Sequence, residues 1–112
     1  MGGNLLPTKI INILLDLDDD PTFAPSSARV VREQKVQWQS TVGPFSVQFV
    51  TTPFDQVIFY SQPPSGGVHQ TIAVPVQAGA AITTYHYAAA VTKETKVVLD
   101  AGCPEIIVTG SS

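Results

Sequence analysis

The most regular feature of the chain is an alternation of apolar and polar residues near its middle. Phe45, Val47 and Phe49 alternate with Ser46 and Gln48. Successive side chains of a β-strand point to opposite faces of the sheet. This spacing therefore predicts a strand with one buried face and one face toward solvent.

Residues 82–91 repeat this pattern over a longer segment. One face of the predicted strand holds Tyr85, Tyr87, Ala89 and Val91. The other face holds Thr84, His86 and Ala88. We expect His86 to point outward or toward a partner sheet, and the tyrosine face to lie in the core.

Short apolar runs rich in Val, Ile, Thr, Phe and Tyr fill the rest of the chain, separated by nine prolines and eight glycines. No window has a helical apolar stripe that lasts three turns. The segments predicted as strands are 9–17, 28–32, 35–39, 45–49, 57–60, 71–76, 82–91, 96–99 and 105–108. Turns are expected between them, and Pro75 should place its strand at an edge or a bulge.

Such a series of short strands is typical of an all-β Greek-key sandwich or barrel of seven to nine strands. The 112 residues correspond to one domain over residues 1–112, with residues 1–8 as a flexible N-terminus. We assign one set of aromatic residues to the core because their spacing follows strand alternation. They are Trp38, Phe45, Phe49, Phe54, Phe59, Tyr85 and Tyr87. We also expect Tyr85 or Tyr87 to donate a hydrogen bond to a loop backbone.

Four parts of the chain, in order, resemble one known family. They are the entry segment 23–30, the strand 35–38 (KVQW), the segment 43–49 (GPFSVQF), and residues 85–87 (YHY) with 101–108 (AGCPEIIV). Together they resemble the cupredoxins, the plastocyanin- and azurin-like domains. The resemblance implies a β-sandwich with a type 1 copper site, which uses two imidazoles, a thiolate and a weak axial thioether.

The four ligand positions that the resemblance implies do not hold those ligands. The first histidine would fall at Phe45, the cysteine at Ala89, the second histidine near Thr92 and the axial methionine near Cys103. Residues 91–97 alternate as a β-hairpin does, so paired strands are expected in place of the metal loop. Phe45 is expected to fill the vacated site.

Three other residues could still bind a metal. Cys103 could be a residual metal ligand, a redox-active thiol or half of an intermolecular disulfide, or simply a small buried residue in a turn. His69 and His86 could form a relocated copper site with it, or be two surface histidines. The alternative function is therefore a copper-binding electron-transfer or copper-handling protein with an atypical site.

An acidic run invites a calcium hypothesis. It contains Asp16, Asp18, Asp19 and Asp20. A helix–loop–helix calcium loop that began at Asp16 would need glycine where Pro21 stands and glutamate where Ser27 stands. We therefore expect a solvated acidic turn, and a calcium site of loop oxygens outside that motif stays open.

Composition narrows the function further. Hydrophobic residues make up 44% of the chain and charged residues 13%, with a net charge of −3. Six lysines and arginines give little basis for a nucleic-acid partner, and one cysteine excludes an internal disulfide. No motif of a known catalytic class is present, so we expect no enzyme.

The sequence thus predicts a non-enzymatic, copper-free binding or structural module without a cofactor. A protein partner or a second copy would bind through an edge strand or a sheet face, such as the strand with Pro75 or the hairpin 91–99. The start of the chain lacks the features of a secretory leader. We expect a soluble protein without membrane insertion, either cytoplasmic or, if a leader was removed, periplasmic or secreted.

Overall fold

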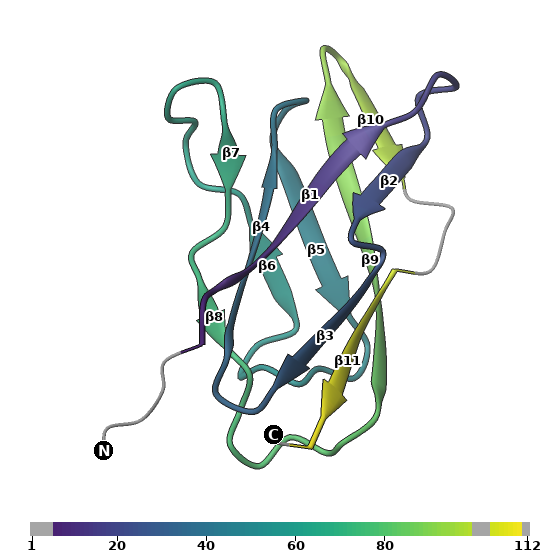
Figure 1. Cartoon of the computed structure of the whole chain (residues 1–112). Helices are drawn as coiled ribbons and strands as arrows, with labels where there is room; N and C mark the ends of the chain where they lie inside the picture. The colour runs from purple at the N-terminus through teal and green to yellow at the C-terminus, as the bar shows by residue number, and fades with distance from the viewer. Residues whose placement is uncertain (1–5, 100–103, 111–112) are drawn as a thin grey trace.

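The computed structural model describes residues 6–99 and 104–110. Within these residues the chain is all-β, as predicted, and forms two mixed sheets packed face to face (Figure 1). The first sheet consists of β1 (Lys9–Leu15), β2 (Pro21–Ala24), β4 (Lys35–Ser40), β7 (His69–Gln70) and β8 (Val74–Pro75). The second consists of β3 (Ser27–Val31), β5 (Phe45–Phe49), β6 (Ile58–Tyr60), β9 (Thr84–Lys93), β10 (Lys96–Leu99) and β11 (Glu105–Thr109).

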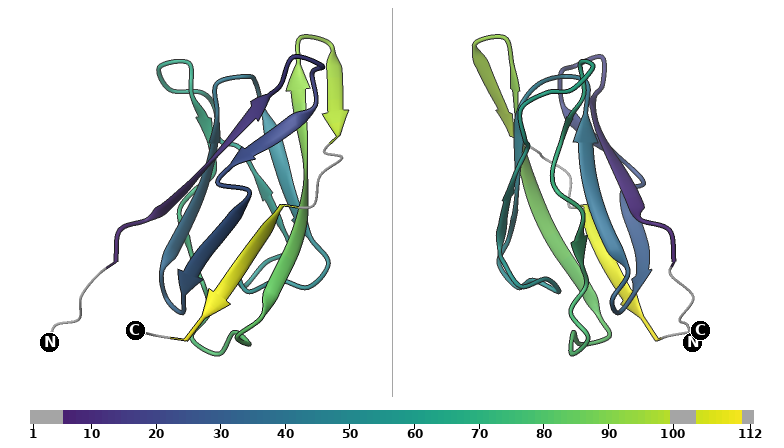
Figure 2. Two further views of the ribbon diagram at one scale, coloured as in Figure 1. Left: turned by 45° about the vertical axis from the view of Figure 1, so that its right-hand side comes forward. Right: turned by 90° about the vertical axis from the view of Figure 1, so that its left-hand side faces the viewer.

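Each sheet combines antiparallel pairs with one parallel pair. In the first sheet the order is β2-β1-β4-β7, where β1 runs parallel to β4 and β8 also pairs with β4. In the second the order is β3-β11-β9-β5-β6, where β3 runs parallel to β11 and β10 also pairs with β9. The two layers are seen edge-on in the right-hand view of Figure 2.

The core lies between the layers and is built around one tryptophan. Trp38 of β4 is fully buried. Its ring lies 6.1 Å from that of Phe49, 5.6 Å from that of Phe59 and 5.5 Å from that of Tyr87, all of the second sheet. The aromatic residues assigned to the core by their spacing are all buried, so that prediction is confirmed.

The longest predicted strand is also confirmed. Tyr85, Tyr87, Ala89 and Val91 of β9 are all buried, whereas His86 is exposed on the opposite face. The hydroxyl of Tyr85 donates a hydrogen bond of 2.8 Å to the carbonyl of Ala81, which is the predicted bond to a loop backbone.

The described residues contain eleven strands, not seven to nine. One addition is β2, which lies between the predicted strands 9–17 and 28–32, where no strand is predicted. Proline is tolerated as the first residue of a strand and at a sheet edge, and β2 satisfies both conditions. Pro75 lies in β8, which pairs only with β4, so its predicted edge position is confirmed.

The other addition is β7, which precedes the predicted strand 71–76, and of that predicted strand only β8 is formed. Thr71 lies between β7 and β8, is 1% exposed, and its hydroxyl accepts a hydrogen bond of 3.2 Å from the backbone N–H of Trp38. The Thr71 carbonyl accepts a bond of 2.8 Å from the side-chain amide of Gln37. Side chains thus replace two backbone partners here, and the ladder is interrupted.

We predict that Thr71→Val destabilises the fold by about 2 kcal/mol, because the buried N–H of Trp38 loses its acceptor. Thr71→Ser keeps the hydroxyl, loses one methyl group and should cost about 1 kcal/mol. Urea denaturation of both variants tests this. Equal or greater stability of the valine variant would show that the hydroxyl does not support β4.

Candidate functional site

Two of the four ligand positions implied by the resemblance come together on the inner face of the second sheet. Phe45 of β5 pairs with Val91 of β9, and Val47 pairs with Ala89. Phe45 and Ala89 are therefore diagonal neighbours on adjacent strands, close enough for side-chain contact. Phe45 is 5% exposed and Ala89 is 3% exposed. A phenyl ring and a methyl group occupy this position, and neither has a lone pair to offer a metal.

Thr92 follows the buried Val91 and is only partly buried. Strand alternation therefore turns its side chain away from the face that holds Phe45 and Ala89. Its backbone N–H donates a bond of 2.8 Å to the carbonyl of Pro44. Thr92 contributes a backbone contact at this end of the sandwich, and its side chain is not part of the Phe45–Ala89 position.

The predicted hairpin is present. β9 and β10 form an antiparallel pair. Lys93 pairs with Lys96 next to the turn, and Ala90 pairs with Leu99 at the other end. The connection is the two-residue turn of Glu94 and Thr95, and Glu94 has a positive φ of 57°. Figure 1 shows this hairpin projecting beside the turn between β1 and β2.

The residual metal candidates do not form a site among the described residues. His69 is in β7 of the first sheet, opposite Ser40, and His86 is in β9 of the second. The only acidic or metal-ligating group near His86 that the structure records is Glu105, whose Oε1 lies 3.8 Å from Nδ1 of His86. Cys103 lies outside the described residues.

The acidic run does gather its carboxylates. Asp16, Asp18 and Asp20 each place a carboxylate oxygen within 4.8 Å of the others, and all three are exposed. Oδ1 of Asp16 accepts bonds of 2.8 and 3.0 Å from the backbone N–H groups of Asp18 and Asp20. The carboxylate of Asp16 thus stabilises the turn by accepting bonds from the backbone of the residues that follow it, which agrees with the expected solvated acidic turn.

The fourth aspartate of the run has a separate partner. Nζ of Lys93 donates a bond of 2.7 Å to Oδ1 of Asp19, which links the β9–β10 hairpin to the first sheet. This bond, together with the charge of Lys93, lowers the pKa of Asp19, and the carboxylate in turn raises the pKa of Lys93. Sequence patterns could not predict this pair, because 74 positions separate its members.

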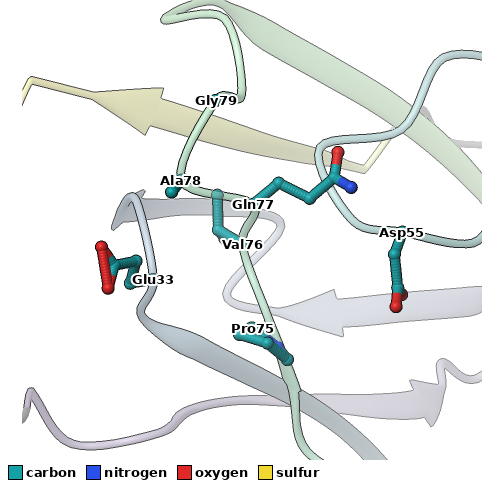
Figure 3. A pocket seen from close by; sticks show the side chains of 7 residues that line it. All are labelled: Glu33, Asp55, Pro75, Val76, Gln77, Ala78 and Gly79. Atoms are coloured by element: carbon teal, nitrogen blue, oxygen red, sulfur yellow. The ribbon is translucent and has the colours of Figure 1, made fainter.

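A surface groove with a volume of about 740 Å³ lies at the end of the molecule opposite the β9–β10 hairpin. It is lined by Glu33, Asp55 and residues 75–79 (Figure 3). The side chains of Glu33 and Asp55 stand on opposite sides of the segment 75–79 (Figure 3). None of the lining residues is a histidine, cysteine, serine or threonine, so the groove offers no nucleophile beside its carboxylates.

Comparison with known proteins adds no relative. No family model matches the chain, and no curated protein sequence is similar to it. The described residues also include no helix with the length and apolar character of a membrane span.

Gly43 makes a close backbone contact that the sequence analysis did not predict. A Cβ atom at this position would overlap the carbonyl oxygen of Thr92, far inside van der Waals contact. This close approach of the segments that contain Gly43 and Thr92 supports the backbone bond between Thr92 and Pro44. We therefore predict that Gly43→Ala destabilises the fold by about 1–3 kcal/mol.

Gly79→Ala is the matched control, because a Cβ there meets nothing within 4 Å. It should be neutral or stabilise by up to about 1 kcal/mol through the unfolded state. Thermal unfolding of both variants tests the prediction, which fails if the two alanines have the same effect.

A second prediction concerns Asp19 and is measured by NMR titration of its carboxyl group. Lys93→Gln should raise the pKa of Asp19 markedly, because both the hydrogen bond and the charge are lost. Lys96→Gln should raise it less, because Lys96 acts only through its charge. Since the folded-state pKa is lowered, the pair stabilises the fold above the ordinary carboxyl pKa, and this contribution is lost as the pH falls through the folded value. A larger effect of Lys96→Gln would contradict the assignment.

Proposed function

We propose that this protein is a cupredoxin-like Greek-key domain that has lost its type 1 copper site and acts as a non-enzymatic binding or structural module. The fold agrees with the first part of the proposal. The segments that resemble the family fall on β2–β3, β4, β5, β9 and β11, which supply strands to both sheets.

One observation supports the loss of copper above all others. Phe45 and Ala89 are inward-facing diagonal neighbours on β5 and β9, as two ligands of one metal would have to be. The position is filled by a phenyl ring and a methyl group, which pack with the core cluster. Type 1 copper needs imidazole and thiolate donors at such a position.

The hairpin supports the same proposal. A metal loop must bring several ligands back to one point, but β9 and β10 continue as paired strands beyond Ala89. The turn of this hairpin lies beyond the end of the sheet, where Lys93 contacts Asp19. A non-enzymatic role agrees with the groove near Glu33 and Asp55, which is wide open and has no histidine, cysteine or hydroxyl residue.

The proposal predicts that added Cu(II) gives no intense visible absorption, because no thiolate–imidazole site is available to bind it. The absorption spectrum of Cys103→Ser with Cu(II) should be the same as that of the wild type. Comparison of the double variant His69→Gln/His86→Gln with the wild type measures how much of any weak, colourless copper binding comes from surface imidazoles. An intense blue or green band that Cys103→Ser abolishes would overturn the proposal.

A further inference from the structure

One outer surface of the molecule is apolar and without charge. It is formed by the strands β10, β9, β5 and β6, and we call it the apolar face. Its apolar residues are Ile58, Tyr60, Ala88, Ala90, Val97 and Leu99. Ser46 and Gln48 of β5 and Thr92 of β9, which pairs with Val97, complete it, and all three are uncharged.

The register of the strands gives this face a definite relief. Leu99 pairs with Ala90, Ala90 with Ser46, and Ser46 with Tyr60. These four side chains therefore form one row across four strands. Leu99 and Tyr60, which are 69% and 66% exposed, stand at its two ends, and the small Ala90 and Ser46 lie between them.

The next row has the same order of side chains on its β6 side, with a small residue on β9 and a large apolar residue on β6. Ala88 pairs with Gln48, and Gln48 pairs with Ile58, which is 37% exposed. A shallow trough of small side chains on β9 therefore runs between a ridge on β10 and a ridge on β6. The same surface has both the projecting and the receding elements that sheet-on-sheet packing requires.

Among the described residues, the lysines of β9 and β10 point away from this face. Lys93 reaches Asp19 of the turn after β1, and Lys96 alternates with Val97, so it faces away from the apolar face. Glu105 lies beside His86, beyond the lower end of the face. Neither a nucleic acid nor an anionic lipid surface would find a cation there.

The outer surface of the first sheet is different in kind. The side-chain amide of Gln39 donates a bond of 2.8 Å to Oδ1 of Asn12, and that of Gln37 donates to the carbonyl of Thr71. Lys35, which alternates with the buried Val36, stands on the same outer surface, and Leu14 is 43% exposed there. The outer surface of the first sheet thus has bonded amide side chains and a lysine, and the residues that form the apolar face include no lysine.

We propose that a second copy of this chain packs on the apolar face, sheet against sheet, with Tyr60 of one copy over the trough at Ala90 of the other. This inference gives the binding role proposed above a surface and a partner. An identical chain fits because the face is uncharged and presents both ridge and trough.

The size of the face sets the strength of the contact. Four strands at about 4.8 Å spacing, with three to five residues each at about 3.3 Å, cover roughly 250–300 Å² in projection. Two such faces bury about 600 Å², somewhat more with their relief counted, which is the size of a weak, transient interface. We therefore expect a dissociation constant on the order of 10–100 µM, with Tyr60 as the aromatic anchor.

Edge-to-edge pairing at β6 is disfavoured by a local bond. The carbonyl of Ile58 accepts a bond of 2.8 Å from the side-chain amide of Gln56. Val57 and Ser61, on either side of β6, use their backbone groups to pair with β5. The free edge of β6 is therefore partly blocked, which favours its outer face as the contact surface.

Sedimentation velocity over a concentration series tests the proposal. The wild-type mass should rise from that of one chain toward that of two, and Tyr60→Lys and Ala90→Lys should each raise the dissociation constant at least tenfold. Leu17→Lys is the matched control, because Leu17 is fully exposed in the turn after β1 and should leave the constant unchanged. Circular dichroism confirms that each variant is folded.

A wild-type protein that stays at the mass of one chain, or lysine variants that dimerise as well as the wild type, would overturn the proposal. So would a dimer that Leu17→Lys abolishes. None of these results depends on copper, so failure of the dimer leaves the metal-free assignment standing. A copper band would overturn that assignment without changing the measured mass.

Discussion

The burial of Trp38 between the two sheets is the constraint on which the rest of the structure depends. Its ring contacts aromatic rings from β5, β6 and β9, so three strands of the second sheet must turn the correct face toward the first. A slip of one residue in any of these strands would turn its aromatic side chain to solvent. Because each aromatic contact adds about 0.5–1.5 kcal/mol beyond its buried area, the register is held firmly.

The same register explains the chemistry of the inner face. Once Phe49 and Tyr87 point at Trp38, alternation makes Phe45 and Ala89 point inward as well, farther along the same two strands. The fold would bring two ligands together at this position, whatever their chemistry. In this chain the side chains there are apolar, and the position continues the core.

The features predicted from the sequence were those that depend on local alternation. The inward and outward faces of β5 and β9, the β9–β10 hairpin and the edge position of Pro75 all follow from neighbouring residues. The features that were missed depend on distant partners. The predicted strand 71–76 begins only at Val74, because the side chain of Thr71 bonds to Trp38 of the neighbouring strand. Lys93 contacts Asp19 only after both sheets have formed.

The parallel pair of β3 and β11 has a consequence for how the chain reaches its native state. The register that joins Ser27 to Glu105 links strands made early and late in synthesis. Until β11 has been synthesised, β3 lacks its neighbour and the second sheet has a gap beside it. Closure over so long a loop is entropically costly, so this pairing forms slowly compared with the formation of the hairpins.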